Sequence, residues 1–224
     1  MTVADPPSIG VFSFGRKQSQ RCPNKMLRPF AGTTLTDIAL TKLSAFGAQA
    51  FFAAYEDEFQ ERCQRHGVGF VRRSLTSATI DEPITEVLAF LRDVPHTHFL
   101  IVNGCLPFLK VKTIQDFLEG CVREGPAPAF AVVRRQNHFI SLDHRPLNFS
   151  PDMKTINSKT VTPLLEFAHA LYFFEKQYFF EHGAYWDWRT VRLIELSDRA
   201  EILDIDTEED FAFAETVWRG RQGT

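Results

Sequence analysis

The sequence lacks long apolar runs, paired cysteines and a strong charge of either sign, and each absence excludes a class of protein. No apolar stretch approaches the roughly 18 residues that a membrane-spanning helix needs, and the N-terminal residues show no basic start followed by an apolar signal core. The four cysteines form no Cys-x-x-Cys pair, so we expect reduced thiols rather than disulfides or a zinc site. The formal net charge of -3 argues against binding along nucleic acid. We therefore expect a cytoplasmic protein that binds neither a membrane nor nucleic acid.

The chain is 224 residues long and 44% hydrophobic, which is enough to bury the core of one domain, so we expect a single domain over residues 1–224. Short apolar runs alternate with amphipathic segments as far as Arg134. This alternation predicts an α/β fold with a mostly parallel sheet and helices on both faces. The expected strands are 9–14, 48–54, 67–73, 97–103, 127–133, 169–174 and 191–196, and the expected helices are 35–46, 56–66, 84–94, 111–124, 176–182 and a last one from about 207.

The alternation degrades after Arg134. The segment "RRQNHFISLDHRPLNFSPDMKTINSKT" is polar and rich in turn-forming residues, and it has no clear period. Apolar residues recur within it, so we expect a lobe or excursion rather than a disordered linker.

Four cations follow the first expected strand, within the stretch "SFGRKQSQRCPNKM": Arg16, Lys17, Arg21 and Lys25. A loop that leaves the carboxyl end of a strand in an α/β sheet is a common place for a phosphate ligand. The clustering predicts a site for a triphosphate, although each lysine taken alone is typical of a solvated surface. No Gly-x-x-x-x-Gly-Lys-Ser/Thr motif occurs, so the sequence does not support a P-loop nucleotide hydrolase.

Two carboxylates stand near the C-terminus in "EILDIDTEED". If residues 202–205 form a strand, Asp204 and Asp206 lie on the same face and can share a divalent cation such as Mg²⁺. The alternative is a solvated strand end before a helix that Thr207 caps with help from Asp210. That alternative explains Asp204 poorly, because Leu203 and Ile205 flank it on an apolar segment.

Three segments carry a resemblance to a known family: "RCPNKMLRPFAGTTLTDIAL", "VNGCLPFLK" and "ILDIDTEEDFAFAE". In this order, over about Ile9 to Glu215, the chain resembles the acylneuraminate cytidylyltransferase family, whose members make CMP-activated sugar acids. The resemblance implies a three-layer α/β/α, Rossmann-like nucleotidyltransferase fold. It also implies a homodimer in which an arm, here residues 134–172, reaches the acceptor pocket of the partner.

The resemblance also implies roles by position. Lys25, Arg16 and Asp206 are expected to be catalytic, Asp204 and Asp206 to bind Mg²⁺, and Asn103 to contact the acceptor. His169 is a candidate for acceptor contact on another ground, because it lies close to the arm that would line the acceptor pocket. The nucleotide-binding residues carried over by position are Arg16, Ser19, Arg21, Lys25 and Arg73. Lys17 is expected to join them because it could supply the positive charge that Gln20 lacks. The sequence departs from the family where Lys17 and Gln18 replace two glycines, Gln20 replaces a lysine, and Met26 replaces an asparagine.

The implied activity is transfer of CMP from CTP to a sugar acid or another small acidic acceptor, with release of pyrophosphate. The departures leave two alternatives open. One is a nucleotidyltransferase with a different nucleotide or acceptor, and the other is a catalytically silent nucleotide-binding or partner protein with the same fold.

Overall fold

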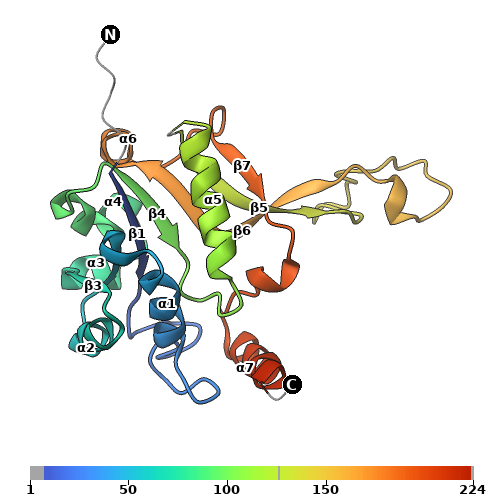
Figure 1. Ribbon diagram of the computed structural model, residues 1–224. Coiled ribbons are helices and arrows are strands. Elements are labelled where there is room, and N and C mark those ends of the chain that lie inside the picture. Colours follow the sequence, from blue (N-terminus) through green and yellow to red (C-terminus); the bar gives the residue numbers. More distant parts are fainter. Residues whose placement is uncertain (1–7, 126, 223–224) are drawn as a thin grey trace, which may run out of the picture.

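The computed structural model describes residues 8–125 and 127–222. Its centre is a seven-stranded sheet in the order β3-β2-β1-β4-β6-β5-β7 (Figure 1). The strands are β1 (Ile9–Phe14), β2 (Ala50–Ala54), β3 (Gly69–Arg72), β4 (His98–Val102), β5 (Ala129–Arg135), β6 (Leu164–Glu175) and β7 (Arg192–Glu195). All neighbouring pairs are parallel except those of β6, which is antiparallel to both β4 and β5. The predicted mostly parallel α/β sheet is confirmed.

Helices cover both faces of the sheet. The α-helices are α1 (Leu35–Ser44), α2 (Asp57–His66), α3 (Leu75–Thr79), α4 (Ile84–Val87), α5 (Val111–Arg123), α6 (Lys176–His182) and α7 (Glu208–Gln222). Short 3₁₀ turns are η1 (Gly47–Gln49), η2 (Ala89–Asp93), η3 (Ser158–Thr160) and η4 (Arg199–Ile202). Within the described residues, no helix is both long and apolar enough to cross a membrane.

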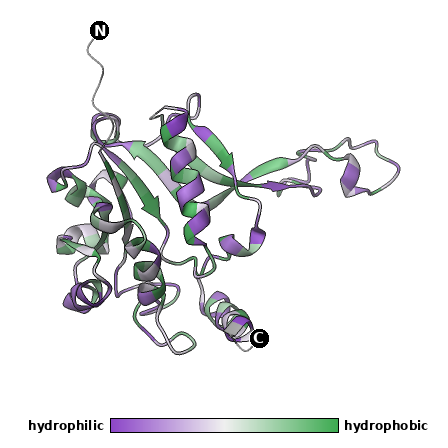
Figure 2. Ribbon diagram, viewed as in Figure 1, coloured by the Kyte–Doolittle hydropathy of each residue, from purple (hydrophilic) through white to green (hydrophobic). Residues whose placement is uncertain are grey.

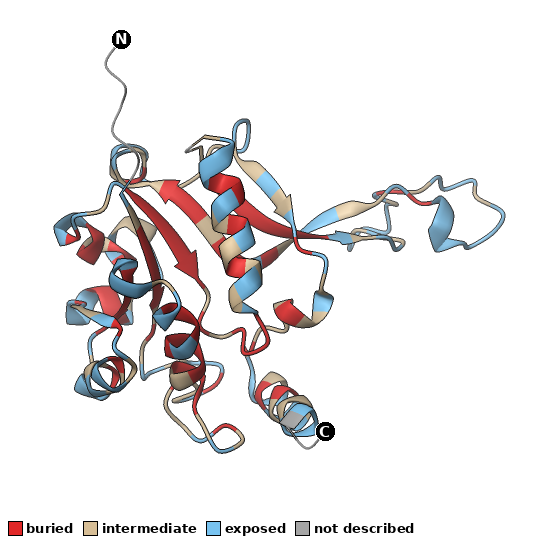
Figure 3. Cartoon of the chain, viewed as in Figure 1, coloured by how far each residue is buried: buried red, intermediate tan, exposed pale blue. Residues whose placement is uncertain are grey.

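The core lies in two layers, one on each side of the sheet. Side chains alternate along β1, so Val11 belongs to the core cluster that includes residues of α1, α2, α5 and α7, whereas Phe12 belongs to the cluster on the opposite face that includes residues of α4, η2 and α6. Figures 2 and 3 show this as apolar, buried strands beneath helices whose outer faces are polar and exposed. The three layers follow from strands that are buried on both faces. All four cysteines are free, as expected, and three of them are buried.

Capping side chains and a glycine determine where several helices begin or end. The Thr34 side chain accepts a hydrogen bond from the Asp37 backbone nitrogen at 3.1 Å and caps α1. Thr207 and Asp210 form a reciprocal cap at the start of α7, where the backbone nitrogen of each donates to the side chain of the other. Glycine in the left-handed region ends α2 at Gly67.

One sequence prediction of secondary structure is wrong, and one condition stated for the aspartate pair is not met. The expected helix 84–94 breaks at Leu88 into α4 and a 3₁₀ turn, and the carbonyl of Val87 accepts hydrogen bonds from the Ser77 and Arg73 side chains instead. The condition that residues 202–205 form a strand is not met. Ile202 ends the 3₁₀ turn η4, and residues 203–206 belong to no helix or strand, although the Ile205 backbone nitrogen donates to the Cys105 carbonyl.

The irregular segment is an excursion that projects from the body of the molecule (Figure 1). β5 and β6 leave the sheet as an antiparallel pair that ends with Arg135 opposite Leu164. Residues 136–163 form the projecting part, which we call the arm, and most of it is exposed (Figure 3). The residues from Leu164 to Tyr172, which were expected to belong to the arm, are part of β6.

Candidate active site

The carboxyl ends of β1 and β4 meet the segment 203–206 at one edge of the sheet. The loop after β1 holds Arg21 and Lys25, and Asn103 directly follows β4. Segment 203–206 reaches this edge because the Ile205 backbone nitrogen donates to the Cys105 carbonyl at 3.1 Å. The edge is where open α/β sheets bind ligands.

Lys25 is the centre of the cationic half of the site. Its Nζ donates to the Ile205 carbonyl at 2.5 Å and lies 3.3 Å from Asp206 Oδ1. Arg21 pairs with the same Asp206 oxygen at 2.9 Å. Burial alone lowers the pKa of Lys25, but Cys105, Asp206 and Asp204 around it outweigh burial, and its pKa is raised above the ordinary value. Lys25 is therefore a fixed positive charge.

Asp204 is the carboxylate in the most unfavourable surroundings. Its Oδ2 accepts a hydrogen bond from Asn103 Nδ2 at 3.2 Å, while its Oδ1 is buried without a partner in the described residues. Burial, followed by the nearby Asp206 charge, raises the pKa of Asp204. A buried carboxylate oxygen without a donor suits a cation ligand.

The donor set fits a divalent ion only in part. Asp204 and Asp206 are oxygen ligands of the type that Mg²⁺ prefers, but Asp206 is engaged by Arg21 and Lys25. Among the described residues, no three His, Cys, Asp or Glu side chains lie close enough to hold a metal by themselves. Further ligands would have to come from substrate and water, as is usual for Mg²⁺ at phosphate sites.

Asn103 and His169, the expected acceptor contacts, lie together beside Asp204. Asn103 Nδ2 also donates to the His169 carbonyl at 2.8 Å, and its Oδ1 accepts from the Cys105 backbone nitrogen at 2.8 Å. The amide of Asn103 is thus occupied in joining β4, β6 and Asp204. His169 is exposed, has a φ of 48°, and its Nδ1 lies 2.7 Å from the hydroxyl of Tyr172.

The first two cations of the loop, Arg16 and Lys17, form ion pairs with carboxylates other than Asp204 and Asp206. Arg16 pairs with Asp81 at 2.8 Å, and Lys17 pairs with Glu58 at 2.6 Å. Ser19 is half-buried in the loop between these ion pairs and Arg21. The structure therefore divides the predicted cluster into two pairs, of which only Arg21 and Lys25 adjoin the aspartates.

Arg73, which was expected to bind the nucleotide, is buried beneath the start of the loop that follows β1. It is 3% exposed and donates to the carbonyls of Gly15 and Val87 at 3.3 and 3.2 Å and to Ser77 Oγ at 3.1 Å. Burial, with a smaller contribution from Arg16, lowers its pKa to about 10. These bonds make Arg73 a support for the start of the loop.

Sequence reasoning missed two residues that shape the loop. Arg28 pairs with Glu208 at 2.7 Å and stacks 3.7 Å from the centre of the Phe211 ring, which ties the loop to α7. Met26 is buried, with its sulfur 3.8 Å from Cys105 Sγ. The sequence marks Met26 only as a departure from the family, and no local pattern signals the role of Arg28.

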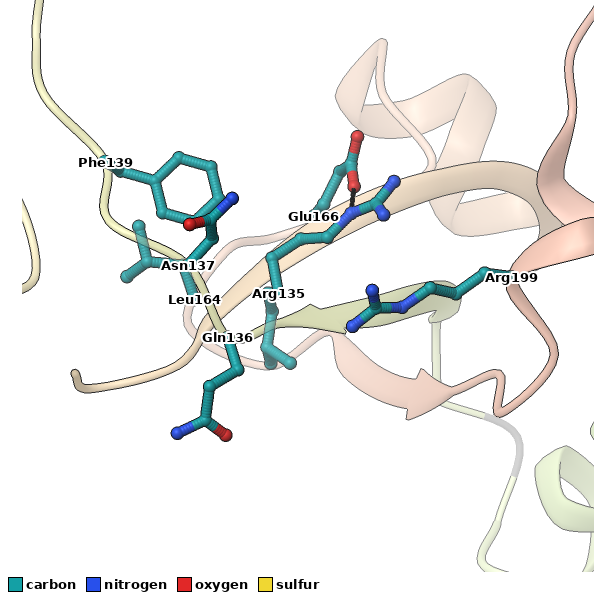
Figure 4. Close-up of a pocket in the computed structure, with 8 residues that line it drawn as sticks. Arg135, Gln136, Asn137, Phe139, Leu164, Glu166 and Arg199 are labelled. Carbon is teal, nitrogen blue, oxygen red and sulfur yellow. Dashed lines mark hydrogen bonds and ion pairs between the residues drawn. The ribbon is translucent and has the colours of Figure 1, made fainter. Parts of the chain in front are cut away.

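A separate pocket of about 440 Å³ lies at the base of the arm (Figure 4). Its lining includes Arg135, which pairs with Glu166, and Arg199, which donates to the Arg134 carbonyl at 3.2 Å. None of its lining residues belongs to the site around Asp204.

Three known structures share this fold at low identity. CMP:2-keto-3-deoxy-manno-octonic acid synthetase complexed with CTP gives a TM-score of 0.66 at 12% identity, over 96% of this chain and 99% of that chain. 4-Diphosphocytidyl-2C-methyl-D-erythritol synthase from Anaerococcus prevotii gives 0.64 at 14%, over 96% and 97%. A cytidylyltransferase from Leptospira borgpetersenii serovar Hardjo-bovis gives 0.57 at 15%, over 94% and 86%.

The sequence itself points to a broader group than the acylneuraminate family. No curated protein matches it, and the expected family is confirmed only as far as the nucleotidyltransferase fold. The model of one family does match most of the chain, over residues 15–194, from the start of the β1 loop into β7. The chain therefore belongs to the MobA-like NTP transferase domain family and is a nucleotidyltransferase.

Proposed function

We propose that the protein transfers CMP from CTP to a small acidic acceptor such as a sugar acid, with a divalent cation as cofactor. The observation that carries the proposal is the convergence of Lys25, Arg21 and Asp206 beside the unpartnered carboxylate oxygen of Asp204. The choice of cytidine rests on the sequence resemblance and on structural neighbours whose names specify cytidylyl transfer or CTP.

In the proposed reaction, a hydroxyl oxygen of the acceptor attacks the α-phosphorus of CTP. A bond forms between this oxygen and the α-phosphorus, and the bond between the α-phosphorus and the oxygen that bridges to the β-phosphorus breaks. Pyrophosphate leaves with the bridging oxygen, and the hydroxyl proton passes to water. Arg21 and Lys25 exchange Asp206 for the phosphates of CTP and balance the charge that develops on them. This exchange frees the Asp206 carboxylate.

A divalent cation held by Asp204 and Asp206 would neutralise phosphate charge and lower the pKa of the attacking hydroxyl. Asn103 keeps Asp204 in place through the hydrogen bond to Oδ2 and leaves Oδ1 available. Arg73 holds the loop from below through the Gly15 carbonyl. Exposed His169 adjoins Asn103 and is proposed to contact the acceptor.

The Asp206→Asn variant tests the role of the carboxylates. We expect Mg²⁺-dependent release of pyrophosphate from CTP in the presence of acceptor to be lost, because a neutral amide cannot balance a divalent ion. The control is Asp116→Asn, which changes an exposed carboxylate on α5. Full activity of Asp206→Asn would contradict the proposed metal site.

Nucleotide choice is tested by the thermal stability of the protein with CTP, UTP, ATP or GTP, each with and without Mg²⁺. A ligand at about 100 times its Kd stabilises the native state by about 2.7 kcal/mol. Selective stabilisation by CTP with Mg²⁺ is expected. Selective stabilisation by another nucleotide would favour the alternative transferase, which the replacement of the family's asparagine by buried Met26 also favours. If no nucleotide stabilises the protein, the result would contradict both the CTP-dependent transferase and the transferase that uses another nucleotide.

We also propose that the arm contacts a second copy of the chain. Its apolar side chains include Leu142, Ile156, Ile140 and Leu147, all of which are exposed. Burying such side chains against another copy is favourable. A homodimer is therefore the expected state in solution.

A further inference from the structure

A groove of about 570 Å³ lies between α1, the loop that precedes α5, and the C-terminal part of α7. These three elements come together below the sheet in Figure 1. Its volume is in the range of about 300–1,000 Å³ that is common for small-molecule sites. Arg21, Lys25, Asp204 and Asp206 do not line it, so it is distinct from the candidate active site.

Lys42 is the unusual residue of the groove. It is only 7% exposed, and its Nζ donates to the Leu106 carbonyl at 2.5 Å. No ion pair involves Lys42 in the part of the chain that the structure describes. Glu201 is the carboxylate whose charge acts on Lys42 and raises its pKa. Glu201 is itself bound by the backbone nitrogen and Nζ of Lys110. A buried ammonium group without an anionic partner is costly.

Two aromatic rings lie among the apolar side chains that line the groove, and its charged side chains are all cations. The rings of Phe108 and Trp218 are 5.7 Å apart, and Arg221 stacks 4.6 Å from the centre of Phe108. The indole nitrogen of Trp218 is buried and has no acceptor among the described residues. Arg221 adds positive charge at the rim, whereas Lys110, which also lines the groove, is paired with Asp198 at 2.7 Å and Glu201 at 3.0 Å. The groove thus offers apolar surface and several donors, and among the described residues it holds no anionic partner for Lys42.

We propose that this groove binds a small amphipathic anion, whose flat apolar part lies against Phe108 and Trp218 and whose carboxylate or sulfonate faces Lys42. Apolar walls alone would accept any flat molecule. Among the described residues neither Lys42 nor Arg221 forms an ion pair, so these two cations favour an anion by charge complementarity. The buried ammonium of Lys42 has one hydrogen-bond acceptor, the Leu106 carbonyl, and can donate further hydrogen bonds to an anion.

Two fluorescent probes with the same rings test the proposal. 8-Anilinonaphthalene-1-sulfonate carries a sulfonate, and N-phenyl-1-naphthylamine does not. Titrations are made at about pH 6, where Lys42, with its pKa lowered by burial to about 7, is largely protonated. The wild-type protein is expected to bind the sulfonate more tightly than the neutral probe, with energy transfer from Trp218 that is lost in Trp218→Phe.

Charge variants give the decisive comparison. Lys42→Met is expected to weaken sulfonate binding by about tenfold or more, since a hydrogen bond to a charged group is lost, and to leave the neutral probe unaffected. Lys112→Met, at an exposed lysine of α5, is the matched control and should change neither. Equal affinity for the two probes in the wild type, or unchanged sulfonate affinity in a folded Lys42→Met, would overturn the proposal.

Arg221→Glu keeps the proposal testable if Lys42→Met does not fold, because Arg221 is exposed and its replacement leaves the core intact. The same selective loss of sulfonate binding is expected, and unchanged binding would overturn the proposal.

Discussion

At the scale of single residues, Asp204 carries a charge that its surroundings disfavour. Its pKa is raised in the folded protein by burial and by Asp206. A carboxyl with a raised folded pKa favours folding while it is protonated, and this contribution is lost as pH rises through the folded pKa. At neutral pH the ionised group therefore destabilises the protein, as is common at functional sites.

We expect Asp204→Asn to raise the melting temperature at pH 7 in the absence of divalent ions, and to raise it less at low pH. The amide can still accept the hydrogen bond from Asn103, so the change removes mainly the charge. Each 1 kcal/mol of relief raises Tm by about 2–4 °C in a domain of this size. Calorimetry at several pH values measures the effect, and a lower Tm at pH 7 would show that the Asp204 charge is already compensated.

Lys25 tests whether the first loop binds phosphate. We expect Lys25→Ala to weaken CTP binding by about tenfold or more, because a charge-assisted contact in a partly buried position is lost. Isothermal titration with CTP measures this loss. Lys17→Ala should have a smaller effect, since Lys17 is exposed and paired with Glu58. An equal loss of CTP affinity in the two variants would contradict the conclusion that only Arg21 and Lys25 of the four cations belong to the site.

At the scale of elements, α1 is held against the loop before α5 by the buried amine of Lys42. Burial lowers the pKa of Lys42 to about 7, whereas the unfolded chain has the ordinary value near 10.5. Between these values the unfolded state binds more protons than the folded state, so stability rises with pH.

We expect the free energy of unfolding to rise between about pH 7 and pH 10 by up to 1.4 kcal/mol per pH unit through this group. Lys42→Met should remove that part of the slope. The measurement is urea unfolding of both proteins across this range, and the difference between them isolates Lys42 from other titrating groups. If the free energy of unfolding has the same dependence on pH in both proteins, the result would contradict the lowered pKa of Lys42.

Elements were predicted well where local patterns decide them. β1 and α6 have the predicted bounds because apolar strands and a following helix leave clear local signals. The predicted helix 84–94 breaks because Arg73 and Ser77, which lie before it in the chain, take the Val87 carbonyl. The strand considered for residues 202–205 does not form: Ile202 ends a 3₁₀ turn, and the Ile205 backbone nitrogen bonds to Cys105, a partner that no local pattern reveals.

At the scale of the whole molecule, the arm projects from the body of the fold, and most of its side chains are exposed. We expect the double variant Leu142→Ser, Ile156→Ser to convert a dimer into a monomer without changing the melting temperature of the separated chain by more than a few degrees. Both side chains are exposed in the single chain, so their loss leaves its core intact.

Light scattering coupled to size-exclusion chromatography measures the mass of both proteins. A wild-type monomer, or a variant that stays dimeric, would contradict the proposed role of the arm. Lys112→Met on α5 is a suitable control, because it changes an exposed residue outside the arm.

The sequence by itself determined the α/β alternation, the cationic loop after the first strand and the pair of aspartates before the last helix. These depend on local periodicity, capping and composition. Only the tertiary structure decided that Arg21 and Lys25 meet Asp206, that Arg16 and Lys17 do not, and that Arg73 is buried. Contacts between Lys25 and Asp206 join residues 181 positions apart, and such pairings depend on how whole elements pack and where their side chains point, which no local pattern encodes.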